Sequence, residues 1–133
     1  YTPIAIKIAP DLNDEQLVKI ASAVVGHEVD GLIATNTTTA RTPSIASHRH
    51  AGESGGLSGR PLADTAREKV IALRQCLPQA FPLIGVGGID GADSAIAMFD
   101  AGANLIQIYT GLIYQGPSLL REILKGMENA SPH

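Results

Sequence analysis

Two consecutive glycines, Gly87 and Gly88, follow the short apolar run at residues 83–86 and precede Asp90, a residue type that often caps a helix. A buried strand that ends on two glycines and leads into a helix restricts the local fold strongly. Glycine amides have no side chain in front of them, so they can close on an anion at the positive end of the helix dipole. The pattern therefore indicates a phosphate group in the ligand, although a tight turn without a ligand would fit it equally well.

A second strand end, further along the chain, strengthens this interpretation. There, Tyr109, Thr110 and Gly111 end the apolar run that begins at Leu105. Their hydroxyl groups and the glycine stand where a neighbouring phosphate contact would be needed. In parallel barrels, a phosphate site built by the last two strand-to-helix connections is a recurrent arrangement.

Strand and helix patterns alternate along the whole chain. Short apolar runs, each closed by polar residues or glycine, predict strands over residues 4–8, 31–35, 83–86 and 105–109. Helical spacing of apolar residues follows each run, over residues 13–26, 61–77, 90–102 and 117–127. This alternation predicts a parallel sheet covered by helices.

The predicted fold class is α/β, with about four βα units that make half of a (β/α)8 TIM barrel. A complete, small, doubly wound sheet is the alternative architecture. The half barrel is favoured because polar residues stand at the C-terminal end of all four strands, where barrel enzymes collect their sites. We expect residues 1–133 to form one domain. We also expect a fragment, because a whole barrel takes roughly 250 residues and the chain starts at Tyr1 without an initiator methionine.

Composition excludes several classes of protein. The chain has 133 residues, of which 44% are hydrophobic, and a net charge of -3, as is typical of globular proteins. With 10 Lys and Arg residues, 3 Tyr, 2 Phe and no Trp, it offers no nucleic-acid surface. No apolar run approaches the roughly 20 residues needed to cross a bilayer, so we expect this segment to be soluble and to make no membrane contact. The single Cys76 cannot form an internal disulfide.

One connection is much longer than the others. Residues 37–57 are rich in Thr, Ser, Gly and His and separate the second strand from its helix. Loops of this length without regular structure are usually functional or disordered. We interpret the segment as a lid over a ligand, hinged at Gly55, Gly56 and Gly59; a flexible insertion is the alternative.

Polar residues on the first two strands suggest further ligand contacts. Lys7 interrupts an apolar strand, and a buried unpaired ammonium group is costly, so we expect an anionic partner, either a ligand or a carboxylate. Thr35, Asn36 and Thr37 suit a polar planar heterocycle, because an amide side chain both donates and accepts hydrogen bonds. Such a cluster also simply ends many strands. The four histidines show no metal-ligand spacing and no catalytic acid or base is evident, so no metal site and no catalytic residue is predicted.

Five ordered blocks together resemble the dihydroorotate dehydrogenase family. They are residues 6–12 (IKIAPDL), 33–38 (IATNTT), 55–62 (GGLSGRPL), 84–89 (IGVGGI) and 107–111 (QIYTG). The combination is specific because it covers nearly the whole chain, whereas the Gly-Gly block alone would fit many phosphate-binding barrels. The ATNTT and IYTG sequences resemble those of the quinone-dependent, membrane-associated class 2 enzymes more than those of the soluble class 1 enzymes.

The resemblance implies an FMN enzyme that oxidises dihydroorotate to orotate in pyrimidine biosynthesis, with a quinone as electron acceptor. It implies a (β/α)8 barrel of which this chain is the C-terminal half. It also implies that Lys7 lies beside the flavin ring and stabilises negative charge on the reduced flavin. The residues implied to bind FMN are Lys7, Thr35, Gly59, Gly88, Tyr109 and Thr110, with Gly88 and the Tyr109–Thr110 backbone at the phosphate. Asn36 and Thr37 are implied to bind the pyrimidine substrate.

The family's catalytic base, a serine in class 2, lies on an earlier strand that is not in these residues, so we expect the chain to be inactive alone. The resemblance places the parent enzyme peripherally on the cytoplasmic face of the bacterial inner membrane. Two other hypotheses stay open. One is a free-standing half-barrel without catalysis that binds a phosphorylated ligand or pairs with its own copy, since its edges would be exposed. The other is a different phosphate-binding barrel enzyme, such as an isomerase or aldolase, for which Lys7 is the only candidate catalytic residue.

Overall fold

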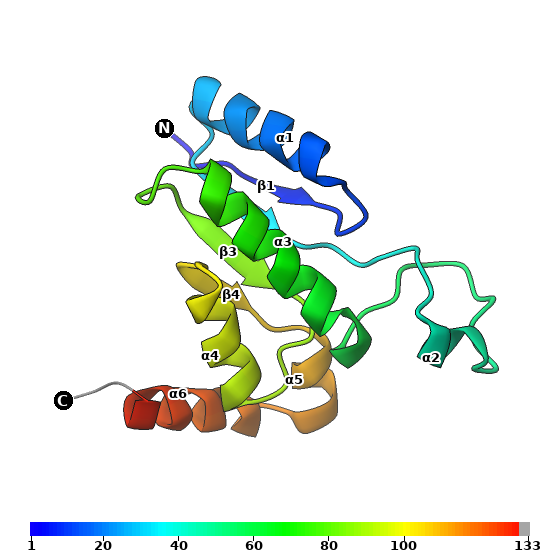
Figure 1. Ribbon diagram of the computed structural model, residues 1–133. Helices are drawn as coiled ribbons and strands as arrows, with labels where there is room; N and C mark the ends of the chain where they lie inside the picture. Colours follow the sequence, from blue (N-terminus) through cyan, green and yellow to red (C-terminus); the bar gives the residue numbers. More distant parts are fainter. Residues whose placement is uncertain (131–133) are drawn as a thin grey trace.

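The computed structural model describes residues 1–130, and its centre is a parallel sheet. The strands are β1 (Ala5–Ile8), β2 (Gly31–Ala34), β3 (Leu83–Val86) and β4 (Leu105–Gln107), and they stand in the sheet in chain order. The long helices that follow them are α1 (Asp14–Gly26), α3 (Ala63–Cys76), α4 (Ala92–Asp100) and α6 (Ser118–Ala130) (Figure 1). The four predicted βα units are confirmed.

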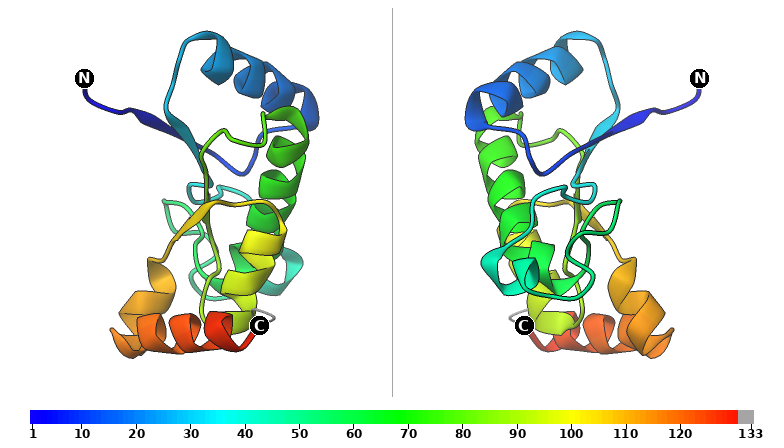
Figure 2. Two further views of the ribbon diagram at one scale, coloured as in Figure 1. Left: turned by 90° about the vertical axis from the view of Figure 1, so that its left-hand side faces the viewer. Right: turned by 90° about the vertical axis from the view of Figure 1, so that its right-hand side faces the viewer.

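The strand order distinguishes the two architectures that the sequence left open. A doubly wound sheet reverses its strand order and carries helices on both faces. Here the order β1-β2-β3-β4 has no reversal, so right-handed crossovers place successive helices on the same face. Figure 2 shows α1, in blue, and α3, in green, on one side of the strands. The doubly wound alternative is therefore wrong, and the sheet is part of an α/β barrel.

The two faces of the sheet differ in exposure. Side chains alternate between faces along a strand, so residues in register share a face. On the helix side, Ile8, Ala34 and Gly85 lie in register and are buried. On the opposite side, the row Lys7, Ile33, Ile84 and Leu105 crosses all four strands, and Leu105 is 60% exposed. In a closed barrel this second face would be the interior.

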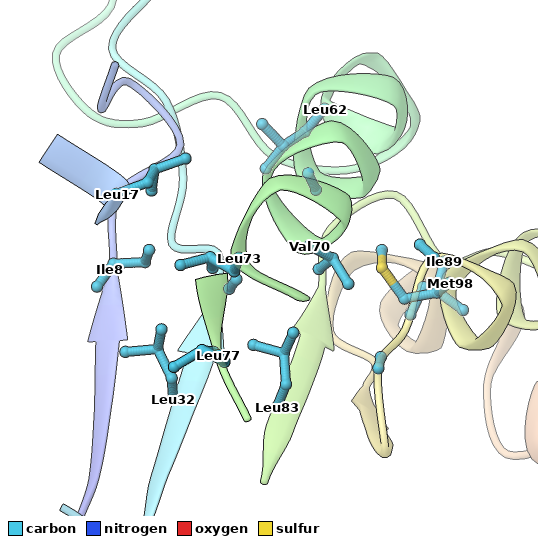
Figure 3. Packing of buried hydrophobic residues seen from close by; sticks show 14 of the residues in the cluster. Ile8, Leu17, Leu32, Leu62, Val70, Leu73, Leu77, Leu83, Ile89 and Met98 are labelled. Atoms are coloured by element: carbon cyan, nitrogen blue, oxygen red, sulfur yellow. The ribbon is translucent and has the colours of Figure 1, made fainter. Parts of the chain in front are cut away.

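The hydrophobic core lies between the sheet and α3. Leu32 and Leu83 from the strands gather with Val70 and Leu73 from the helix, and all four are 0% exposed (Figure 3). The helix faces the sheet with residues spaced three or four apart, which is the pattern of an amphipathic helix. This packing holds the C-terminal ends of β2 and β3 in place, where the polar residues begin.

Local signals explain some helix ends and miss others. The predicted start of α1 is confirmed, because the Asn13 side chain accepts from the Gln16 amide and the Gln16 side chain accepts from the Asn13 amide, both at 2.9 Å. The fourth strand ends at Gln107, two residues before the predicted end. The short elements α2 (Pro43–Ala46), η1 (Arg60–Leu62) and α5 (Thr110–Gln115) were not predicted.

Candidate functional site

A cavity of about 850 Å³ opens at the C-terminal ends of the four strands. The eight residues predicted to bind cofactor or substrate all line it: Lys7, Thr35, Asn36, Thr37, Gly59, Gly88, Tyr109 and Thr110. They come from four strand ends and from the end of the long loop. The structure therefore brings the predicted residues together, while the role of each stays a prediction. The volume lies within the roughly 300–1,000 Å³ of small-molecule sites.

The glycines after β3 form one edge of this cavity. Gly87 and Gly88 have φ angles of +132° and +70°, in the region that favours glycine. A Cβ atom on Gly88 would come within 2.5 Å of the Ala63 Cα atom and 2.8 Å of its nitrogen, so the loop lies tightly against the first turn of α3. Within residues 1–130, neither glycine amide donates to a protein acceptor. Both amides are thus available to a ligand.

The end of β4 completes this edge. Thr110 and Gly111 are the first residues of α5, and first-turn amides have no partner within their helix. A Cβ atom on Gly111 would overlap the carbonyl oxygen of Ile89, so the start of α5 lies directly beside the β3 loop. Thr110 also donates to the hydroxyl oxygen of Ser58 at 3.0 Å. The ends of two adjacent strands and Ser58, just after the long loop, therefore meet at one edge of the cavity.

Asp90 does not cap the helix that follows it, which corrects the prediction. The N-cap of α4 is Gly91, and the Ser94 hydroxyl accepts from the amides of Asp90 and Gly91 at 3.0 and 3.1 Å. The Asp90 carboxylate instead forms an ion pair with Arg60 at 2.6 Å. Gln115 donates to the Asp90 carbonyl at 2.6 Å. These contacts tie η1, the β3 loop and α5 together at the cavity rim.

At the end of β2, the backbone is hydrogen-bonded to neighbouring strands and two polar side chains are exposed. Thr35 is 1% exposed, and its amide donates to the Val86 carbonyl at 2.9 Å. The Asn36 amide donates to the Ile8 carbonyl at 2.7 Å, which fixes the backbone against β1. The side chains of Asn36 and Thr37 are exposed and line the cavity. The sheet therefore holds the backbone in place, while the Asn36 and Thr37 side chains line the cavity.

The apolar strand around Lys7 had suggested that its side chain is buried. In this structure Lys7 is exposed, because its face of the sheet is open. No carboxylate in residues 1–130 forms an ion pair with it. Of the two partners expected for its charge, a carboxylate is therefore wrong for the described chain. Lys7 lines the cavity, and a ligand there as its anionic partner stays a prediction.

The loop 37–57 is closed at its base next to the site. Thr38 and Leu57 exchange two backbone hydrogen bonds, of 3.2 and 2.8 Å. The backbone of Gly56 lies directly on Thr37, since a Cβ atom there would overlap the Thr37 side chain. Gly55 and Gly59 have φ angles of +119° and +76° and stand at the predicted hinge. Lid movement stays a prediction.

Several lining residues were not predicted as site residues, namely Ser58, Arg60, Asp90, Gln107, Tyr114 and Gln115. Ser58 and Arg60 lie inside the GGLSGRPL block and Gln107 begins the QIYTG block, so their position within these motifs was the available signal. Tyr114 and Gln115 belong to α5, which the sequence did not reveal. No group of three potential metal ligands occurs in residues 1–130, and His133 lies outside the described part. None of the helices described combines the length and apolar character needed to cross a membrane.

Comparison with known proteins places this geometry in context. A protein-family model described as Dihydroorotate dehydrogenase matches residues 1–130. The dihydroorotate dehydrogenase (quinone) of Shewanella oneidensis is 50% identical over 125 residues, which are 94% of this chain and 37% of the relative. That of Shewanella baltica is 52% identical over 124 residues, which are 93% of this chain and 36% of the relative. The chain thus spans little more than a third of the length of these curated relatives.

Two solved structures from Eimeria tenella share the fold, one described as DHODH in complex with ferulenol and the other as ligand-free DHODH. Each is 36% identical to this chain, and the TM-scores are 0.89 and 0.90. The matches cover 95% and 97% of this chain but 33% and 36% of the solved chains. The similarity therefore extends over nearly all of this chain in both sequence and structure.

Proposed function

The chain belongs to the dihydroorotate dehydrogenase family, and on that premise we propose that its cavity forms part of the FMN and pyrimidine site of a quinone-dependent dihydroorotate dehydrogenase. The reaction is the oxidation of dihydroorotate to orotate, with a quinone as the final electron acceptor. When bound, FMN supplies the redox chemistry by taking up the hydride from the substrate. The parent enzyme is proposed to lie peripherally on the cytoplasmic face of the bacterial inner membrane.

The observation that carries the proposal is that the cavity offers positive groups at two separate places. Its edge at Gly88 and Thr110 offers backbone amides that have no protein acceptor within residues 1–130, and such amides suit a phosphate group. Lys7, on β1, lies two strands from β3 and three from β4, and it brings a cation without an ion-pair partner in residues 1–130. A ligand with a phosphate at one end and a ring that gains negative charge at the other fits this arrangement, and FMN has both.

Each of the predicted site residues is then assigned a role. The amides of Gly88, Tyr109 and Thr110 hold the phosphate, and Gly59 and the buried Thr35 shape the wall along the flavin. The exposed side chains of Asn36 and Thr37 donate to and accept from the pyrimidine, since an amide and a hydroxyl match its alternating carbonyl and N–H groups. Lys7 stabilises negative charge on the ring.

None of the lining residues is assigned as the catalytic base. The base of class 2 enzymes is a serine on an earlier strand, so we propose that the chain alone does not turn over dihydroorotate. Because the flavin would lack its other walls, we also propose that free FMN binds the chain weakly.

The phosphate edge is expected to be preformed, because its amides lie on two adjacent strand ends within residues 1–130. Titration of isotope-labelled chain with inorganic phosphate should shift the amide resonances of Gly88 and Thr110, and the amide of Gly26, at the end of α1, serves as the control. FMN should shift the same two resonances. Undisturbed Gly88 and Thr110 signals at high phosphate, in a folded sample, would refute a preformed site.

A further inference from the structure

Arg41 joins two parts of the loop 37–57 through main-chain carbonyl groups. Its Nε donates to the carbonyl of Ala51 at 3.2 Å, and its Nη2 donates to those of Glu53 and Gly55 at 3.2 and 2.8 Å. Its Nη1 donates to the carbonyls of residues 38–40 at 3.1 to 3.4 Å. A guanidinium group has five N–H donors in a fixed plane, so it can hold two backbone segments in one geometry.

Apart from Arg41, other polar contacts order this loop, including those of the Asp11 carboxylate with the Thr38 hydroxyl and the Thr39 amide. Its regular structure is the four-residue helix α2 and the bridge between Thr38 and Leu57. Among the loop side chains that the structure describes, only Thr38 is buried, so hydrophobic packing contributes little. Arg41 itself forms no ion pair with a carboxylate of residues 1–130, and the nearby Glu53 pairs with His50. The charge of Arg41 therefore acts on the loop backbone.

The contacts of Arg41 lead directly to the cavity wall. Gly55 accepts the shortest of them, and the next residue, Gly56, lines the cavity with its backbone against the Thr37 side chain. Further along, the Ser58 hydroxyl oxygen accepts from Thr110. Residues 55–59 are thus held at one end by Arg41 and at the other by the phosphate edge. Arg41 does not line the cavity.

We propose that Arg41 is a positioning residue: it holds residues 55–59 against Thr37 and Thr110 and so sets the wall of the cavity that faces the ligand. The identity of that ligand as FMN rests on the proposed function. The effect of Arg41 on the loop backbone does not rest on the proposed function, because it follows from the contacts of Arg41 alone.

The test compares Arg41→Met with Arg49→Met. Arg49 is a matched control in the same loop, since it is exposed and, among the described residues, donates only to the neighbouring His50 ring. Loss of several charge-assisted hydrogen bonds should speed amide hydrogen exchange over residues 55–59 by about ten-fold or more. FMN affinity should fall by about ten-fold, because the wall must be ordered again on binding. Arg49→Met should change neither.

The outcomes separate this proposal from the proposed function. Unchanged exchange over residues 55–59 in Arg41→Met overturns the positioning role. Faster exchange there, with unchanged FMN affinity in a chain that binds FMN, also overturns it, because the order that Arg41 gives to the wall then does not affect ligand binding. If the wild type binds no FMN, the proposed function fails, and faster exchange alone supports the positioning role. Arg41→Lys keeps the charge but reaches fewer carbonyls, so it should show a smaller rise and gives the same test if Arg41→Met does not fold.

Discussion

Replacing Gly88 with alanine is expected to lower the free energy of unfolding by about 3–5 kcal/mol and to abolish phosphate binding. Two costs combine at this position. The φ angle of +70° is unfavourable for any residue with a Cβ atom, and that atom would overlap the backbone of Ala63 at the start of α3. Since backbone cannot rotate away as a flexible side chain can, the loop must move, and the two glycine amides move with it. Denaturant unfolding and a phosphate titration measure the two effects.

Gly116→Ala is the matched control for the conformational cost. Gly116 has a φ angle of +68°, almost the same as Gly88, but a Cβ atom there would meet nothing within 4 Å. We expect this variant to lose only about 1–2 kcal/mol and to bind phosphate normally. Equal losses of stability in the two variants would show that the close approach of the β3 loop to α3 is not a constraint on the site.

Replacing Lys7 with methionine is expected to slow the bleaching of flavin absorbance by dihydroorotate by about 100-fold, in a protein that contains the complete barrel. The ammonium group is placed to offset negative charge that develops on the ring, and methionine retains most of the side-chain length without the charge. The melting temperature of the chain described here should stay unchanged, because Lys7 has no ion-pair partner in residues 1–130. Anaerobic stopped-flow absorbance and thermal unfolding measure the two quantities.

Lys19→Met is the control for the loss of a positive charge. Lys19 lies on the exposed surface of α1, pairs with Glu15 at 2.6 Å and does not line the cavity. It should leave the bleaching rate unchanged. A wild-type rate in Lys7→Met, together with a lower melting temperature, would show that Lys7 is a structural residue and would contradict its assignment to the flavin.

The sequence was sufficient to predict that the candidate site residues lie together. In a parallel sheet, the C-terminal ends of all strands meet at one edge, so polar residues that follow each strand must lie near one another. Lys7, Asn36, Gly88 and Thr110 come from four different strands and still line one cavity. The alternating pattern of apolar runs and helical spacing therefore predicts both the fold and the grouping of these residues at one cavity.

Features that depend on distant contacts could not be predicted. Asp90 was expected to cap a helix, but its carboxylate binds Arg60, thirty residues earlier in the chain. The N-cap is Gly91, and the Ser94 hydroxyl accepts from its amide. The helix α5 has six residues, too few for an amphipathic pattern to appear. Lys7 was expected to be buried because its neighbours are apolar, whereas burial depends on what covers the other face of the sheet. The contacts of Asp90 thus depend on a residue distant in sequence, and the burial of Lys7 depends on what covers the sheet.

A crystal structure at saturating FMN would test the central claim most directly, namely that this cavity is a flavin site with its phosphate at the ends of β3 and β4. We expect the phosphate within hydrogen-bond distance of the amides of Gly88 and Thr110, and the ring directed toward Lys7. An FMN molecule bound outside the cavity, or one with its phosphate on Lys7, would contradict the account.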